Sequence, residues 1–195
     1  MKILGVTGSR AEFGILRLVF QALKADPRFD FQLAVTGQHW SPGSTSVSEI
    51  EAAGLTVDYK VDMGLSDGAN VASALCAATG QAVAGAGAVY DACQPDMVLV
   101  LGDRYEILAF AFAALLSRVP LAHLSGGDVT EGAFDDSIRH ALTKLSAVHF
   151  AFTRDAVGRI CQMGEDPAHV HFTGSPAIDA ILQNDILDRA AFGPL

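Results

Sequence analysis

Short segments rich in β-branched residues alternate along this chain with segments in which apolar residues recur at helical spacing. The first strand-like segment is "KILGVTG" at residues 2–8, and helical spacing follows it from Phe13 to Pro27. Further strands are predicted at residues 31–37, 55–61, 96–102, 119–127, 148–153 and 170–174. Helices are predicted near 45–53, over 69–93 and 104–118, from Asp135, up to Met163 and from Pro176. This alternation predicts an α/β fold, a doubly wound parallel sheet with helices on both faces.

Polar residues cluster in the segments that directly follow three of these predicted strands. In a doubly wound sheet, ligands bind beyond the carboxyl ends of the strands, where the strand order reverses. In the common order 3-2-1-4-5, that point lies between the first and fourth strands. The segments 7–14, 102–106 and 125–132 follow the first, fourth and fifth strands, so we expect the functional site there.

Composition excludes several classes of partner. The chain has 195 residues and a net charge of −9, which argues against nucleic acid because such binding needs a basic surface. The apolar run at 107–116 is shorter than the roughly 20 residues of a membrane span, so no membrane association is expected. The three cysteines form no CxxC pair and suit reduced thiols, which predicts a cytoplasmic protein.

The segment "TGSRAEFG" at 7–14 joins a predicted strand to a helix. The amides and the positive dipole end of that helix are suited to an anion, and Arg10 adds a fixed charge. The spacing matches neither GxGxxG nor a Walker loop. An ordinary strand-to-helix turn with a solvated arginine explains the segment equally well.

The segment "LVLGDRYE" places Asp103 at a strand end, directly after a bend at Gly102. A catalytic carboxylate fits this position, and so does an N-cap for the helix from Arg104. Arg104 is predicted to pair with Glu106 or with a ligand.

In "SGGDVTEGAFDDSIRH", Gly126 and Gly127 allow a ligand to approach the backbone, or they adopt positive φ. If a helix begins near Asp135, then Asp135 pairs with Arg139 and Asp136 with His140 at i, i+4 spacing. Ordinary capping and surface pairing account for the same residues equally well.

Three histidines lie outside these segments. His39 follows the second predicted strand in a loop and is a candidate for lining the crevice. His169 and His171 are expected to share a face of one strand and to be structural, because no third ligand lies nearby. No metal or cofactor is expected.

The segments "TGSRAEFG", "TGQHWSPG", "LVLGDRYE", "HLSGGDVTEGAFDDSIRHALTKLSAVHF" and "FTGSPAID" occur in this order and cover essentially the whole chain. Together they resemble the hydrolysing UDP-N-acetylglucosamine 2-epimerases, especially the branch that serves sialic-acid-type sugars. The resemblance implies two Rossmann-like domains of glycosyltransferase-B architecture with the active site between them. Residues 1–174 would be the N-terminal domain and residues 175–195 the crossover towards a second domain. The chain alone is then expected to be inactive.

The family reaction eliminates UDP across C1 and C2 to give a glycal, then adds water to give the free 2-epimeric sugar. By resemblance, Arg10 is the N-terminal loop arginine, and Asp103 and Arg104 are the "GDR" pair. The acidic pair and the helix arginine fall on Asp135, Asp136 and Arg139. The proposed catalytic carboxylates are thus Asp103, Asp135, Asp136 and Glu131, with His39, Ser125, Gly126, Gly127 and the three arginines binding substrate.

One departure from the family pattern bears on the substrate. Many members of the sialic-acid branch have Glu where this chain has Ser125, and one extra residue precedes Asp135. Asp128 or Glu131 is the candidate replacement for that carboxylate. The resemblance implies UDP-GlcNAc or a UDP-2,4-diacetamido-2,4,6-trideoxyhexose as substrate in nonulosonic acid biosynthesis, and a homodimer. A non-catalytic sugar-nucleotide-binding or assembly domain and a glycosyltransferase remain alternatives.

Overall fold

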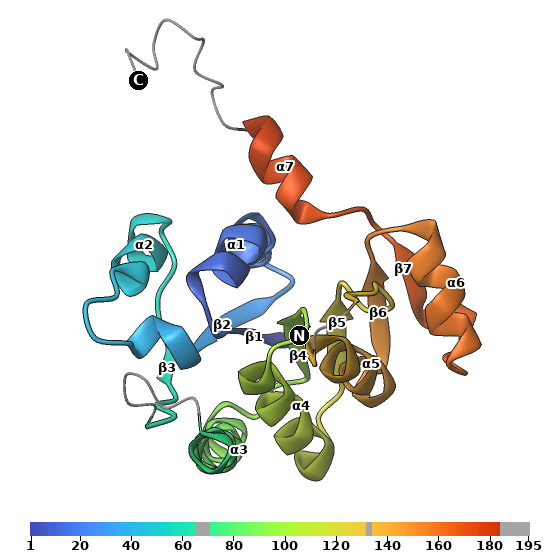
Figure 1. Cartoon of the computed structure of the whole chain (residues 1–195). Coiled ribbons are helices and arrows are strands. Elements are labelled where there is room, and N and C mark those ends of the chain that lie inside the picture. The colour runs from blue at the N-terminus through green and yellow to red at the C-terminus, as the bar shows by residue number, and fades with distance from the viewer. Residues whose placement is uncertain (65–70, 132–133, 184–195) are drawn as a thin grey trace, which may run out of the picture.

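The computed structural model describes residues 1–64, 71–131 and 134–183. Seven parallel strands form one sheet in the order β3-β2-β1-β4-β5-β6-β7 (Figure 1). The strands are β1 (Lys2–Thr7), β2 (Asp30–Val35), β3 (Tyr59–Lys60), β4 (Met97–Leu101), β5 (Leu121–Leu124), β6 (Val148–Ala151) and β7 (Val170–Phe172). The helices are α1 (Arg10–Ala25), α2 (Ser46–Ala52), α3 (Ala72–Cys93), α4 (Tyr105–Ser117), α5 (Asp135–Leu145), α6 (Arg154–Gln162) and α7 (Pro176–Gln183), with 3-10 helices η1 (Gly37–Trp40) and η2 (Pro167–His169). The doubly wound parallel sheet is confirmed, and its order reverses between β1 and β4.

The third and fifth strands are shorter than the predicted segments 55–61 and 119–127. At β3, the side-chain carboxylate of Asp58 accepts a hydrogen bond from the Leu33 amide at 2.8 Å. This bond replaces a backbone hydrogen bond between β2 and β3, so the strand begins only at Tyr59. At β5, Ser125 has φ 65°, a left-handed conformation that ends the strand.

Two helix starts also differ from the prediction. Helix α1 begins at Arg10, three residues before the predicted start, because the Ser9 hydroxyl caps the Glu12 amide. Helix α3 begins at Ala72, while the first part of the predicted helix 69–93 lies outside the described residues.

The side chains of the sheet alternate between two hydrophobic cores. On one face, Leu4 and Val98 pack with α3, α4 and α5. On the other face, Ile3 and Leu99 pack with α1 and α2. Figure 1 shows the two groups of helices on opposite sides of the sheet. The alternation follows from the two-residue period of a strand.

Helix α3 is, in the part of the chain that the structure describes, the one helix long and apolar enough to span a membrane, with a mean hydropathy of 1.3. It packs along α4, and the Tyr90 hydroxyl donates to the Phe110 carbonyl at 2.9 Å. Ala82 and Ala86 on the same helix are fully buried. We therefore interpret α3 as one of the helices that cover the sheet.

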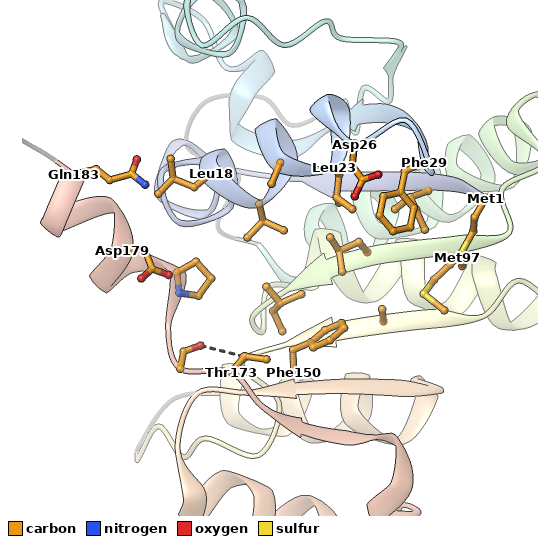
Figure 2. Close-up of a pocket in the computed structure, with 18 residues that line it drawn as sticks. Met1, Leu18, Leu23, Asp26, Phe29, Met97, Phe150, Thr173, Asp179 and Gln183 are labelled. Atoms are coloured by element: carbon orange, nitrogen blue, oxygen red, sulfur yellow. Dashed lines mark hydrogen bonds between the residues drawn. The ribbon is translucent and has the colours of Figure 1, made fainter.

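An apolar groove of about 650 Å³ opens on the α1 side of the sheet, between α1 and α7 (Figure 2). Its lining includes Leu99 and Ala122 from the sheet, Leu23 from α1 and Pro176 from α7. The groove also reaches Met97 at the amino end of β4. Because ligands of doubly wound sheets bind at the carboxyl ends of the strands, we do not place the functional site in this groove.

The predicted boundary after residue 174 falls at the loop between β7 and α7. Gly174 lies in this loop with φ 74°. Helix α7 then runs beside α1 (Figure 1), and its Ile178, Ile181 and Leu182 are exposed. Residues 184–195 of the predicted crossover lie outside the described residues, so the division into domains stays a prediction.

Candidate functional site

Three polar loops meet at the carboxyl edge of the sheet because β1, β4 and β5 are parallel neighbours. They follow Thr7, Leu101 and Leu124, as the sequence predicts. The Gly102 amide donates to the Leu124 carbonyl at 3.1 Å, which joins the second loop to the end of β5. The site therefore lies at the point where the strand order reverses.

An ion pair between Asp103 and Arg139 forms the centre of this site. The Arg139 guanidinium donates through Nη2 to Oδ2 of Asp103. The Arg139 side chain is 10% exposed and that of Asp103 22% exposed, so the carboxylate remains accessible. The predicted pairing of Asp135 with Arg139 is wrong, because the arginine turns across to the end of β4.

Asp103 does not cap the helix that follows it. Helix α4 begins at Tyr105, and its N-cap residue is Arg104, which makes no side-chain cap bond. Arg104 pairs through Nε with Oε1 of Glu106 at 2.5 Å, one of the two partners predicted for it. The carboxylate of Asp103 is therefore engaged by Arg139 and open to solvent on its other side.

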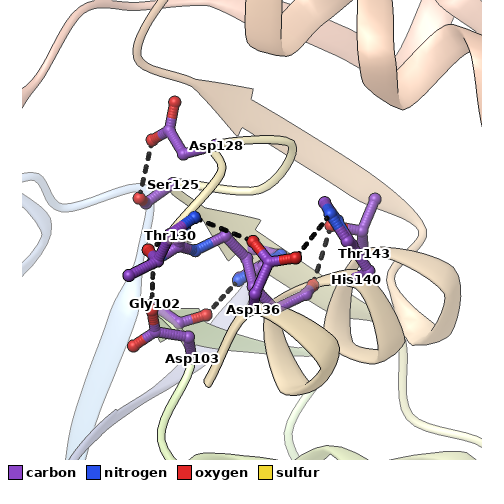
Figure 3. Close-up of polar contacts among 10 residues, drawn as sticks. Gly102, Asp103, Ser125, Asp128, Thr130, Asp136, His140 and Thr143 are labelled. Atoms are coloured by element: carbon purple, nitrogen blue, oxygen red, sulfur yellow. Dashed lines mark hydrogen bonds and ion pairs between the residues drawn. The ribbon is translucent and has the colours of Figure 1, made fainter. Parts of the chain in front are cut away.

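A chain of hydrogen bonds extends from Arg139 across the first turns of α5 (Figure 3). Arg139 Nη1 donates to the Thr130 hydroxyl at 2.9 Å, and the Thr130 amide donates to Asp136 at 2.8 Å. Asp136 lies 3.5 Å from Nε2 of His140, which confirms the predicted pairing at i, i+4. Asp135 begins α5 and is half-buried. The loop after β5 is thus tied to α5.

Ser125 and Asp128 contact each other at the start of that loop. The Ser125 hydroxyl donates to Oδ2 of Asp128 at 3.0 Å. Glu131 is exposed at the far end of the loop, next to residues 132–133, which lie outside the described chain. Of the two candidate replacements for the family glutamate, Asp128 is therefore the carboxylate that reaches the Ser125 position.

The two glycines of this loop lie in close packing, and at Gly127 that packing requires glycine. Gly127 has φ 75°, and a Cβ there would lie 2.5 Å from the Ala156 carbonyl oxygen of α6. A Cβ on Gly126 would lie 3.0 Å from Nδ1 of His123. The predicted positive φ holds for Gly127, and its close approach is to α6.

Two of the amides predicted to be free at the start of α1 have protein partners. The Gly8 amide donates to Oε2 of Glu12 at 2.8 Å, and the Ser9 hydroxyl accepts the Glu12 amide. Arg10 lies 2.9 Å from Glu49, and its side chain is 74% exposed. Arg10 is therefore an exposed surface charge that is paired with Glu49.

His39 is buried within η1, where the sequence predicts an open loop. Its Nε2 lies 3.1 Å from the Thr7 hydroxyl and its Nδ1 lies 2.8 Å from the Ser46 hydroxyl. Burial lowers the pKa of His39 to about 4, so the ring is neutral at pH 7. Both nitrogens are occupied by protein groups, and the ring fastens the loop after β2 to β1 and α2.

The expectation that His169 and His171 share a strand face is wrong, because His169 ends η2 before β7 begins. The His171 ring stacks on Phe150 at 5.7 Å between centroids. Among residues 1–64, 71–131 and 134–183, no group of three or more His, Cys, Asp and Glu side chains is placed to hold a metal ion.

The burial of three titratable groups near the site was not predicted from the sequence. His123 is fully buried, and its Nε2 donates to the Gly102 carbonyl at 2.8 Å. Glu12 and Glu106 are also buried, at 6% and 0% exposure. Acidic residues in the first turn of a helix ordinarily indicate capping, so the sequence carried no signal of their burial.

A seven-stranded doubly wound sheet with its charged loops at the carboxyl edge defines a Rossmann-like domain of the kind that forms the N-terminal half of a glycosyltransferase-B architecture. Comparison with known proteins gives the family. A family model described as UDP-N-acetylglucosamine 2-epimerase matches residues 21–191, and the chain belongs to this family.

Three relatives are about one-third identical to this chain over the aligned residues. A UDP-N,N'-diacetylbacillosamine 2-epimerase (hydrolyzing) of Legionella pneumophila is 36% identical over 98% of the chain and 50% of its own length. A GDP/UDP-N,N'-diacetylbacillosamine 2-epimerase (hydrolyzing) of Campylobacter jejuni is 35% identical over 96% and 48%. Polysialic acid biosynthesis protein P7 of Escherichia coli is 35% identical over 89% and 44%. The chain spans about half the length of these relatives.

Solved structures share the fold. The UDP-GlcNAc 2-epimerase from Neisseria meningitidis, solved with UDP-GlcNAc bound, superimposes with a TM-score of 0.82 at 24% identity. That likeness covers 93% of this chain and 49% of the other. A putative UDP-N-acetylglucosamine 2-epimerase from Listeria monocytogenes gives a TM-score of 0.81 at 25% identity, over 96% and 48%.

Proposed function

We propose that this chain is the N-terminal half of a hydrolysing 2-epimerase that acts on a UDP-linked N-acetylated amino sugar. The single observation that carries the proposal is the Asp103–Arg139 ion pair at the point where the strand order reverses. Family membership supports the reaction, which is elimination of UDP to a glycal and then hydration to the free 2-epimeric sugar. We propose that this reaction occurs in the biosynthesis of nonulosonic acids.

The reaction requires removal of the C2 proton and stabilisation of the departing diphosphate, and the site residues are suited to both. The C2 proton of a sugar without a carbonyl is weakly acidic, so a positioned carboxylate has to accept it. We assign Asp103 to proton transfer, because Arg139 fixes its carboxylate while leaving it accessible. Asp135, Asp136 and Glu131 are the other candidate carboxylates.

The departing diphosphate carries negative charge that cations have to stabilise. Arg104 is suited to this task, because its Nε is bound to Glu106 while its side chain stays 30% exposed. Arg10 is more exposed and would have to leave Glu49 to reach a ligand.

We propose a UDP-2,4-diacetamido-2,4,6-trideoxyhexose as the preferred substrate. The names of the relatives from Legionella pneumophila and Campylobacter jejuni support it. Ser125 supplies a small neutral side chain where many sialic-acid-branch members have Glu, which leaves room for a 4-acetamido group. Polar groups that a substrate leaves unpaired discriminate strongly against it.

The test compares the two donors side by side with the natural full-length protein, following UDP release and exchange of the C2 proton with solvent. We expect a higher kcat/KM for the diacetamido sugar than for UDP-GlcNAc. Equal or better use of UDP-GlcNAc would refute the substrate and leave the reaction standing. Inactivity with both donors would contradict the epimerase function itself.

We also propose a cytoplasmic location and a homodimer for the full-length protein. The three cysteines form no disulfide with one another, which supports a reducing compartment. The homodimer rests on the family resemblance alone and is tested by the molar mass in solution.

A further inference from the structure

Two buried carboxylates face the same glycine at the reversal point of the sheet. Glu12, in the first turn of α1, accepts the Gly8 amide through Oε2 at 2.8 Å. Glu106, in the first turn of α4, packs so tightly against Gly8 that a Cβ there would lie 2.5 Å from its Cγ. The reaction proposed above uses neither side chain.

Each of these carboxylates has one oxygen without a hydrogen-bond partner among the described residues. These atoms are Oε1 of Glu12 and Oε2 of Glu106. Both are buried, so bulk solvent does not reach them. An ionised carboxylate that is buried and half-satisfied is costly, and a second carboxylate beside it raises the pKa of one of the two.

Arg104 distinguishes the two carboxylates. Burial raises the pKa of Glu106, but the Nε of Arg104 donates to its Oε1 at 2.5 Å and opposes that shift. The negative charge of the pair is therefore stabilised on Glu106 rather than on Glu12. Among the residues that the structure describes, the Glu12 carboxylate has only the Gly8 amide and the Ser9 hydroxyl as partners. Burial and the neighbouring Glu106 raise the pKa of Glu12 to about 8, which agrees with a protonated Glu12 at neutral pH.

We propose that ionised Glu106 is a positioning residue that holds Arg104 with its terminal nitrogens towards the diphosphate of the substrate, and that Glu12 serves this arrangement by staying protonated. This inference rests on the proposed function. Only Nε of Arg104 is bound within the described part of the chain, so both terminal nitrogens are free for a bidentate contact with phosphate. The cluster then contains one carboxylate and one guanidinium.

A pH dependence follows from the second carboxylate. When Glu12 loses its proton, a second negative charge appears beside Arg104 and weakens its attraction for the diphosphate. The other charged or titratable groups that face this cluster are Tyr105 and Asp135. Burial raises the pKa of Tyr105 further above its ordinary value, and an arginine does not deprotonate in this range. Affinity for UDP is therefore expected to fall above about pH 8, the pKa of Glu12.

The matched variants are Glu12→Gln and Glu106→Gln in the natural full-length protein, with exposed Glu51→Gln as control. Glutamine is a neutral copy of protonated glutamic acid. Glu12→Gln should therefore keep its UDP affinity at pH 7 and lose the decline above pH 8. Glu106→Gln removes the charged anchor of Arg104, so Kd for UDP and KM for the sugar nucleotide should rise by about tenfold or more.

The readouts are the Kd for UDP by calorimetry from pH 6 to about 9.5 and the carboxyl ¹³C shift of Glu12 in glutamate-labelled protein, assigned with Glu12→Gln. Titration of Glu12 near its ordinary value of 4.5 would overturn the proposal, as would an equal loss of affinity in both variants at pH 7. If Glu106→Gln does not fold, the pH profile of Glu12→Gln still decides, because an unchanged alkaline decline contradicts the role of Glu12.

The proposed function and this inference fail differently. If the wild type binds UDP and Glu12 titrates near pH 8 but no sugar nucleotide is turned over, the reaction is wrong and the carboxylate pair stands. If turnover is normal and Glu12 titrates near 4.5, the reaction stands and the inference is wrong.

Discussion

At the scale of single residues, the pairing of Asp103 with Arg139 decides which carboxylate to test first. Replacing Asp103 with Asn keeps the shape of the side chain and its contact with Arg139 while removing the base. In the natural full-length protein we expect elimination to slow by about 10²- to 10⁴-fold, the usual contribution of general base catalysis. The rate of UDP release at saturating substrate measures this loss.

The control for this change is Asp26→Asn. Asp26 also pairs with an arginine, Arg28, but on the surface at the end of α1. The Asp26→Asn substitution should leave turnover unchanged, since exposed ion pairs contribute little to stability. Near-normal turnover of Asp103→Asn with an unchanged melting curve would show that Asp103 does not transfer the proton.

Local sequence rules predicted where the candidate site residues lie better than they predicted the contacts of those residues. The pairing of Asp136 with His140 is confirmed because both partners lie on one helix, where i, i+4 spacing brings them together. Arg139 pairs instead with Asp103, which is 36 residues away in the chain. The two residues lie close together only because β4 and β5 are neighbours in the sheet. The burial of Glu12 and Glu106 depends on tertiary packing in the same way.

At the scale of elements, the alternation of periods two and 3.6 was sufficient to predict the parallel sheet and its helices. Element ends were less predictable, because capping and left-handed residues set them. The cap made by Ser9 starts α1 earlier in the chain than predicted, and the positive φ of Ser125 ends β5 earlier than predicted. These are side-chain and backbone details that hydrophobic periodicity does not encode.

The contact between the loop after β5 and α6 gives a prediction about stability. Gly127→Ala would place a methyl 2.5 Å from the Ala156 carbonyl and 2.7 Å from Cγ1 of Ile160, at φ 75°. We expect a loss of about 1–3 kcal/mol in the free energy of unfolding, from backbone strain and overpacking. Urea denaturation measures it.

Gly158→Ala is the matched control, because Gly158 lies within α6 and a Cβ there meets no atom within 4 Å. It should be neutral or add up to about 1 kcal/mol through helix propensity. If Gly127→Ala were as stable as Gly158→Ala, the loop would not be held against α6 as described.

At the scale of the whole molecule, the candidate site residues lie in the loops and first helical turns at the carboxyl edge of one sheet. The chain spans about half the length of its relatives, and a glycosyltransferase-B site lies between two domains. A chain of residues 1–195 that is purified alone has a sizeable core on each face of its sheet. We expect it to unfold cooperatively, as single domains of this size do.

The same isolated chain should release no UDP from either donor. One wall of a cleft can supply Asp103 and Arg104, but it cannot exclude water or enclose the nucleotide, and both are needed for charge stabilisation to be strong. The measurement is a coupled assay of UDP release beside a melting curve, with the natural full-length protein as the positive control. Release of UDP by the folded chain alone would show that the edge of this sheet is sufficient for the reaction, and would contradict the prediction that a second domain is needed for chemistry.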